Sequence, residues 1–126
     1  MKIGIIGFGA IGFDVAKKLD QEKDQFNVIG VHSRTKNKII DKTTSFNSPL
    51  RYFSLDEICK KCDVVIDCAP KEAFKEIIQK CLDYKTKLIT VSGAGILENQ
   101  EIINTAREHS TQIFLAAGAI IGLDGL

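Results

Sequence analysis

The first twelve residues constrain the fold of this chain more than any other segment. An apolar run, Ile3 to Ile6, leads directly into Gly7-x-Gly9-x-x-Gly12, the spacing G-x-G-x-x-G. In a strand–turn–helix unit the first glycine permits the tight turn, the second lets a pyrophosphate approach the backbone, and the third lets the helix pack against the strand. The helix that follows would direct its free N–H groups at the phosphates. The segment therefore predicts a dinucleotide-binding unit, in preference to a glycine-rich turn without a ligand.

The residues just after the second predicted strand, 26–31, bear on the choice between NAD and NADP. A site selective for NAD carries Asp or Glu there, because a carboxylate accepts hydrogen bonds from the ribose hydroxyls and repels a 2′-phosphate. This chain has Ser33 and Arg34 instead, followed by Lys36, and no acidic residue before Asp41. A guanidinium offers a planar fork of donors to a phosphate dianion. The pattern favours NADP over NAD, although Arg34 and Lys36 as solvated loop charges remain an alternative.

Strand and helix patterns alternate along the rest of the chain. A capping box, Ser54 with Glu57, predicts a helix over Leu55 to Lys61, and helical spacing recurs after Pro70 and over 98–109. Near-continuous apolar strands predict a parallel sheet covered on both faces. We therefore expect a doubly wound α/β (Rossmann) domain with strand order 3-2-1-4-5-6 and a long connection at 36–48. The six predicted strands are 3–6, 26–31, 50–53, 63–68, 87–92 and 112–116.

Composition excludes several other classes of protein. The 126 residues, 44% of them hydrophobic, suffice for one core and not for two ordinary domains. Seventeen basic and sixteen acidic side chains give a net charge of +1, which provides no field for nucleic acid or a membrane surface. No apolar stretch reaches spanning length and no leader precedes the first strand, so we expect a cytoplasmic location.

The four cysteines do not form the pattern of a disulfide framework. Cys59 and Cys62 have the spacing C-x-x-C, which leaves metal or redox chemistry open as an alternative. A structural zinc site needs a second pair of ligands, and a thioredoxin-type pair opens a helix, whereas this pair closes one. Cys68 and Cys81 occupy ordinary positions for buried thiols. We therefore predict no metal site.

Three turns of small residues fall where strands of the predicted sheet end, the edge at which such sheets bind ligands. They are Cys68-Ala69-Pro70, Ser92-Gly93-Ala94-Gly95 and Ala117-Gly118-Ala119. Small side chains leave room for a nicotinamide ring, and Ser92 has a hydroxyl for a substrate or carboxamide group. The alternative is that each turn only needs a flexible backbone. The residues predicted to bind the cofactor are Gly7, Phe8, Gly9, Ala10, Ile11, Gly12, Ser33, Arg34, Ala69, Pro70, Ser92, Gly93 and Ala119.

The segment 118–126, Gly-Ala-Ile-Ile-Gly-Leu-Asp-Gly-Leu, taken with the opening glycine loop, resembles the L-aspartate dehydrogenase family. That family typically has P-S-G-A-I-G-G-L-D at this place, and its E-A-x-K-E helix start is similar to the run that begins at Glu72. The chain departs from the pattern at Ala116 and Ala117, in place of Pro and Ser, and at Ile121, in place of Gly. Ser33 stands where many members carry Asp, which also favours NADP.

The resemblance implies oxidative deamination of L-aspartate to iminosuccinate, with hydride transfer to NADP or NAD. In that family the catalytic histidine and most substrate contacts belong to a second domain. We therefore expect residues 1–117 to form the cofactor domain and 118–126 to begin the connection to a second domain. Neither His32 nor His109 is placed to act as that histidine, so we predict no catalytic residue here. An apolar face near Ile120 leads us to expect a homo-oligomer.

Two other functions remain possible. One is a different two-domain NAD(P)H reductase, such as a relative of dihydrodipicolinate reductase or homoserine dehydrogenase. Such enzymes share the glycine loop but not the run from Gly118 to Asp124. The other is a non-enzymatic nucleotide sensor of similar size, in which the ribose position is normally acidic and not Ser33-Arg34.

Overall fold

The computed structural model describes residues 1–22, 25–34, 46 and 50–116. The expectations for the connection at 36–48, Phe46 apart, and for Ala119, Ile120 and the closing motif therefore lie outside the described residues. Every helix of the described part is too short or too polar to cross a membrane.

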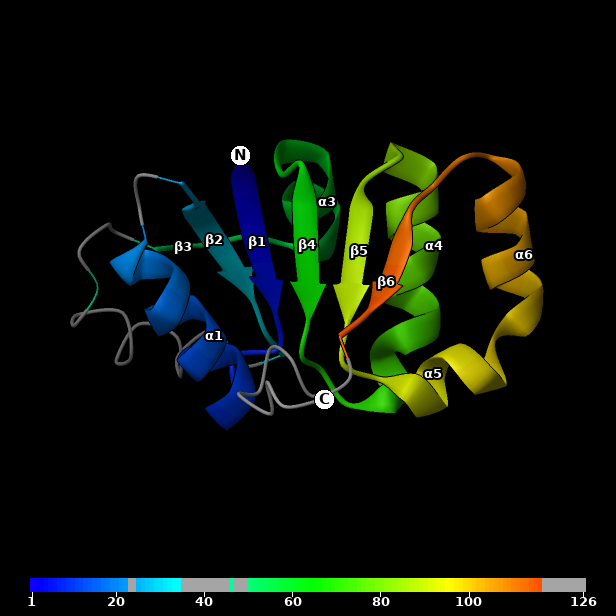
Figure 1. Cartoon of the computed structure of the whole chain (residues 1–126), viewed down its shortest axis with the longest axis horizontal. Helices are drawn as coiled ribbons and strands as arrows, with labels where there is room; N and C mark the ends of the chain where they lie inside the picture. Colours follow the sequence, from blue (N-terminus) through cyan, green and yellow to red (C-terminus); the bar gives the residue numbers. More distant parts are fainter. Residues whose placement is uncertain (23–24, 35–45, 47–49, 117–126) are drawn as a thin grey trace.

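A six-stranded parallel sheet forms the centre of the molecule, in the order β3-β2-β1-β4-β5-β6 (Figure 1). The order is the predicted one, and all six predicted ranges overlap the observed strands. All five strand pairings are parallel, so the carboxyl ends of the strands lie along one edge of the sheet. The strands are β1 Lys2–Ile6, β2 Asn27–His32, β3 Arg51–Tyr52, β4 Val64–Asp67, β5 Lys87–Thr90 and β6 Ile113–Leu115.

Helices lie on both faces of the sheet. In Figure 1, α1 lies on the near side of the sheet, and α3 and α4 lie on the far side. Apolar residues of α1 pack on one face with Ile3, Ile5 and Val31, whereas α3 and α4 pack on the other with Ile6 and Val65. The helices are α1 Ala10–Gln21, α3 Leu55–Lys61, the 3-10 turn η2 Lys71–Ala73, α4 Phe74–Tyr84, α5 Gly93–Glu98 and α6 Gln100–Glu108.

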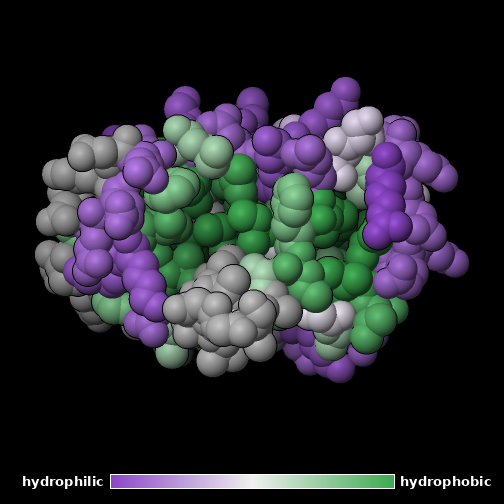
Figure 2. Space-filling model, in the orientation of Figure 1, coloured by the Kyte–Doolittle hydropathy of each residue, from purple (hydrophilic) through white to green (hydrophobic). Residues whose placement is uncertain are grey.

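The face that carries α1 is only partly covered by the described residues. Parallel strands are joined by right-handed crossovers, so the connections from β4 to β6 place their helices on the opposite face from α1. Val64, Ile66 and Ile89 consequently line an apolar groove of about 460 Å³ beside α1. Figure 2 shows this groove as the hydrophobic band in the middle of the molecule.

The structure differs from the sequence prediction between residues 92 and 109. The predicted turn after β5 is the start of α5, because the Ser92 hydroxyl accepts a hydrogen bond from the Gly95 N–H at 2.9 Å and caps the helix. The predicted helix over 98–109 is α6, which begins at Gln100. The two helices are separated by Asn99, whose φ of −128° is not helical and whose side chain donates to the Gly95 carbonyl at 2.8 Å.

Candidate functional site

The glycine loop connects β1 to α1 at the carboxyl edge of the sheet. Gly7 has a φ of +84°, in the left-handed region that side chains disfavour. Its N–H donates to the His32 carbonyl at 2.8 Å, which ties the loop to the end of β2. A Cβ at Gly7 would also lie 2.6 Å from the Ala69 nitrogen, in the turn after β4. Both the backbone conformation and the close approach of that turn therefore require glycine here.

The other two glycines of the motif differ in their surroundings. A Cβ at Gly12 would collide with the Gly7 carbonyl oxygen, because the first turn of α1 packs directly on the loop. A Cβ at Gly9 would meet none of the described residues within 4 Å. Gly9 is the N-cap residue of α1 and, as a glycine, has no side chain that could cap this helix end. The space in front of the α1 N-terminus is therefore open in the described structure, which suits a phosphate group.

A cleft of about 590 Å³ extends along this edge, between the glycine loop, the end of β2 and the turn after β4. Eight predicted cofactor residues line it: Gly7, Phe8, Gly9, Ile11, Ser33, Arg34, Ala69 and Pro70. Nine further residues that were not predicted also line it: Ile6, His32, Leu55, Cys68, Glu72, Ala73, Glu76, Ile77 and Val91. The structure therefore brings the glycine loop, the ribose-side residues and the first small-residue turn into one cleft.

Four predicted residues do not line this cleft. Ala10 and Gly12 lie in the first turn of α1, and Ser92 and Gly93 lie at the start of α5. The Ser92 hydroxyl is engaged as the N-cap of α5. Contact of Ser92 with a substrate or a carboxamide stays a prediction.

At the end of β2, hydrogen bonds fix the backbone that carries Ser33 and Arg34. The His32 Nδ1 lies 2.8 Å from the Phe53 carbonyl oxygen and must donate to it, because a carbonyl only accepts. The Tyr52 hydroxyl donates to the Ser33 carbonyl at 3.3 Å. Arg34 is exposed and lines the cleft.

Sequence reasoning missed the two acidic residues of the cleft, Glu72 and Glu76. Both are exposed and lie on the turn η2 and the first turn of α4, after the small residues Ala69 and Pro70. Their spacing of four residues places them on one side of a helix. That spacing, combined with the rule that ligands bind beyond the carboxyl ends of the strands, was the available signal.

A buried carboxylate lies just behind this cleft. Asp67, the last residue of β4, is 1% exposed. It accepts hydrogen bonds from the Ala69 N–H at 2.9 Å and from the Thr90 hydroxyl at 2.8 Å. The Thr90 oxygen in turn accepts from the Ser92 N–H at 3.0 Å. Burial raises the pKa of Asp67 above its ordinary value.

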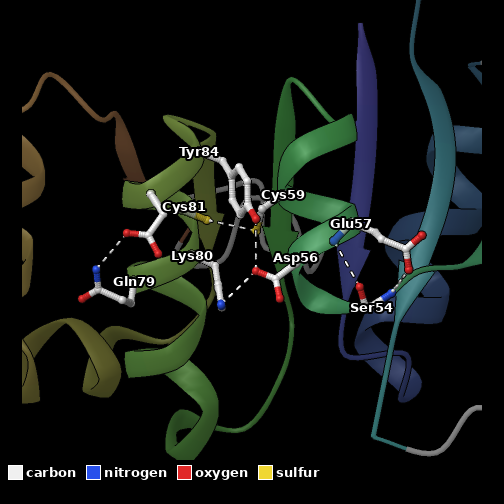
Figure 3. A network of polar contacts seen from close by, with 9 residues as sticks. Ser54, Asp56, Glu57, Cys59, Gln79, Lys80, Cys81 and Tyr84 are labelled. Carbon is white, nitrogen blue, oxygen red and sulfur yellow. Dashed lines mark hydrogen bonds and ion pairs between the residues drawn. The ribbon is translucent and has the colours of Figure 1, made fainter.

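The C-x-x-C cysteines are not part of the cleft. The Cys59 sulfur lies 3.9 Å from the Cys81 sulfur, where α3 packs on α4 (Figure 3). Burial raises the pKa of Cys62 to about 12, so this thiol is protonated at neutral pH. Among the residues that the structure describes, no three His, Cys, Asp or Glu side chains are grouped to hold a metal ion.

Known proteins with similar sequences include NAD-binding domains and L-aspartate dehydrogenases. A family model described as "Homoserine dehydrogenase, NAD binding domain" matches residues 7–116. The L-aspartate dehydrogenase of Methanococcoides burtonii is 30% identical over 100% of this chain and 48% of its own length. Other L-aspartate dehydrogenases match at 24 to 32% identity. This chain thus spans about half the length of the curated relatives it matches. The predicted resemblance to L-aspartate dehydrogenases is confirmed.

Solved structures confirm the Rossmann fold. Biliverdin reductase from Synechocystis sp. PCC 6803, in complex with biliverdin and NADP+, superimposes with a TM-score of 0.79 at 13% identity, over 96% of this chain and 39% of that one. Scyllo-inositol dehydrogenase from Lactobacillus casei, with bound NAD(H) and scyllo-inositol, superimposes with a TM-score of 0.72 at 15% identity, over 92% of this chain and 36% of that one. Since the family model covers nearly all of the described residues and includes the glycine loop, the chain belongs to the family of homoserine dehydrogenase NAD-binding domains.

Proposed function

We propose that the cleft binds a nicotinamide dinucleotide, with NADP preferred over NAD, and that the chain is the cofactor-binding half of an enzyme like L-aspartate dehydrogenase. The observation that carries the proposal is Gly9. Nothing among the described residues requires glycine there, yet the position opens on a helix N-terminus free of side-chain caps. A pyrophosphate fits that space and accepts hydrogen bonds from the exposed N–H groups.

The preference for NADP is supported by the end of β2. Ser33 and Arg34 line the cleft where an NAD-selective site carries an acid, and Tyr52 fixes the backbone that presents them. The cleft's own acidic residues, Glu72 and Glu76, lie on η2 and α4 and not at the end of β2. A charge-assisted bond to the 2′-phosphate contributes about 1.5–3 kcal/mol, or roughly ten- to a hundredfold in affinity.

Calorimetric titration with NADPH and NADH tests this preference. We expect tighter binding of NADPH in the wild type and a smaller difference in the Arg34→Ala variant. The matched control is Arg51→Ala, which removes an exposed arginine of β3 that does not line the cleft. Equal affinities of the wild type for the two nucleotides would contradict the proposal.

The proposed reaction is the oxidation of L-aspartate to iminosuccinate with hydride transfer to the bound NADP or NAD. In this proposal residues 1–117 form the cofactor domain, 118–126 begin the connection to a second domain, and that domain supplies the catalytic and substrate-binding groups. The support is that the L-aspartate dehydrogenases match along the whole chain and are about twice its length. Assembly as a homo-oligomer and a cytoplasmic location stay predictions.

A second candidate is the cofactor half of another two-domain reductase, related to homoserine dehydrogenase. The description of the matching family model favours it. The substrate distinguishes the two candidates, since the second would act with L-homoserine and not with L-aspartate. A longer protein that contains this chain would be assayed with both amino acids.

A further inference from the structure

We propose that Asp67 is a positioning residue that holds the turn after β4 against the glycine loop and so shapes the nicotinamide half of the cleft. The proposal rests on the proposed function, because it assigns a role within the dinucleotide site. It concerns a residue that does not itself line the cleft.

The Asp67 carboxylate organises two strand ends at once. One oxygen accepts from the Ala69 N–H at 2.9 Å and the other accepts from the Thr90 hydroxyl at 2.8 Å. Through Thr90 it also fixes Ser92, whose N–H donates to the Thr90 oxygen at 3.0 Å. These bonds join the end of β4 to the end of β5 at the edge where the cleft lies.

The turn that Asp67 holds is in direct contact with the glycine loop. The Cys68 N–H donates to the Ile6 carbonyl at 2.7 Å, immediately before the loop. At Gly7 the loop passes so close to Ala69 that a Cβ would lie 2.6 Å from the Ala69 nitrogen. Ala69 and Pro70 form the wall of the cleft on this side. A shift of the turn would therefore move this wall of the cleft.

The position of the turn assigns its effect to one half of the ligand. In this fold the pyrophosphate lies at the α1 N-terminus and the adenosine ribose lies at the end of β2. Ser33 and Arg34 are on that adenosine side of the cleft. The nicotinamide half must then extend the other way, past the ends of β4 and β5, where Asp67 and Thr90 lie.

A carboxylate is better suited to this role than its amide. Asp67 accepts two hydrogen bonds, and an ionised carboxylate has acceptors only. An asparagine can accept from the Ala69 N–H, but it presents an NH₂ group to Thr90 or must give up one contact. The Thr90 hydroxyl then has no acceptor for its proton, so the hydrogen bond that Thr90 donates to residue 67 is lost.

The test compares whole dinucleotides with their adenine halves. Dissociation constants would be measured for NADPH and NADH, and for adenosine 2′,5′-bisphosphate and ADP. Asp67→Asn and Thr90→Val are each expected to weaken dinucleotide binding roughly tenfold, the scale of one hydrogen bond to a charged group. Binding of the adenine halves should change less than about twofold, since their contacts lie at β2 and α1. Thr90→Ser, which keeps the hydroxyl, should restore wild-type affinity.

Thr86→Val is the matched control. It also removes the hydroxyl of a buried threonine, one that donates to the Cys59 carbonyl at the other end of β5. It should lower thermal stability without changing any of the dissociation constants. If Asp67→Asn does not fold, the pair Thr90→Val and Thr90→Ser carries the test alone.

Equal losses of affinity for dinucleotides and adenine halves in these variants, or no loss at all, would overturn the positioning role. The proposal that the cleft binds dinucleotides would still stand. Failure of Thr90→Ser to restore affinity would overturn it as well. A wild-type chain that binds none of the four ligands would overturn the proposed function and this proposal together.

Discussion

Gly9 and Gly12 belong to one motif, but a side chain would meet different surroundings at the two positions. At Gly9 a Cβ would meet none of the described residues within 4 Å, and the backbone there, with φ −80°, is one that valine adopts. We therefore expect Gly9→Val to fold like the wild type. Its affinity for dinucleotides should fall roughly a hundredfold or more, because the side chain would fill the pyrophosphate position. Thermal melts and calorimetric titration of the same sample measure both effects.

Gly12→Ala provides the contrasting control. Its Cβ would collide with the Gly7 carbonyl, so the variant should lose about 1–3 kcal/mol of the free energy of unfolding. Wild-type affinity in Gly9→Val would show that the loop is not the phosphate site.

Asp67 also predicts a pH dependence of stability. Burial raises the pKa of this carboxyl in the folded protein, whereas the unfolded chain has a value near 3.8. Between the two values the folded protein holds a proton that the unfolded chain has released, so this carboxyl's contribution to the free energy of unfolding falls as pH rises. The neighbouring thiol of Cys68 does not interfere, because burial raises its pKa to about 12.

Asp67→Asn removes this dependence. The melting temperature of the variant minus that of the wild type should therefore increase between about pH 4 and pH 7. Other carboxyl groups cancel in this difference. A difference that stays constant over the range would show that the pKa of Asp67 is not raised.

Among the helices, α3 has the most complete local cap. The Ser54 hydroxyl accepts from the Glu57 N–H at 3.2 Å, and the Glu57 carboxylate accepts from the Ser54 N–H at 3.1 Å (Figure 3). Ser54→Ala should lower the free energy of unfolding by about 1 kcal/mol, measured from the urea midpoint. Asp56→Asn, which breaks the ion pair between Asp56 on α3 and Lys80 on α4, should change the midpoint little. An unchanged midpoint in Ser54→Ala would contradict a stabilising cap.

The helix α3 was predicted with its observed bounds, because the two residues of its cap, Ser54 and Glu57, are only three positions apart in the sequence. The helix α5 was not predicted, because the run from Gly93 to Gly95 has the composition of a loop. Its cap depends on Ser92, whose N–H is bonded to Thr90 and through it to Asp67 on another strand. That contact joins distant parts of the chain, and local patterns do not contain it.

The candidate site was likewise predicted where local spacing determines it and missed where contacts between distant segments determine it. The glycine loop and Ser33-Arg34 were found because fixed spacings within one βαβ unit place them. Glu72 and Glu76 were missed as cleft residues because their positions follow from how η2 and α4 meet the loop in three dimensions.

At the scale of the whole molecule, the proposal separates binding from turnover. If the second half of the enzyme holds the acid–base and substrate groups, this chain should bind dinucleotide and show no L-aspartate-dependent reduction of NADP or NAD. Loss of positioned catalytic groups costs several factors of ten each. Absorbance at 340 nm, the nicotinamide band, measures this, with a full-length L-aspartate dehydrogenase as the positive control. Measurable turnover would show that the catalytic groups lie within these residues.

The strand order also has a consequence for how the chain folds. The first strand, β1, lies at the centre of the sheet, and the Lys2 N–H donates to Asp63 across a sequence separation of 61 residues. During synthesis β1 can pair with β2 early, but its other edge stays open until β4 has left the ribosome. Long-range parallel pairing of this kind slows folding and leaves an apolar strand edge exposed in the meantime. The nascent chain is therefore most prone to aggregation after β2 has formed and before Val64 pairs with Ile3.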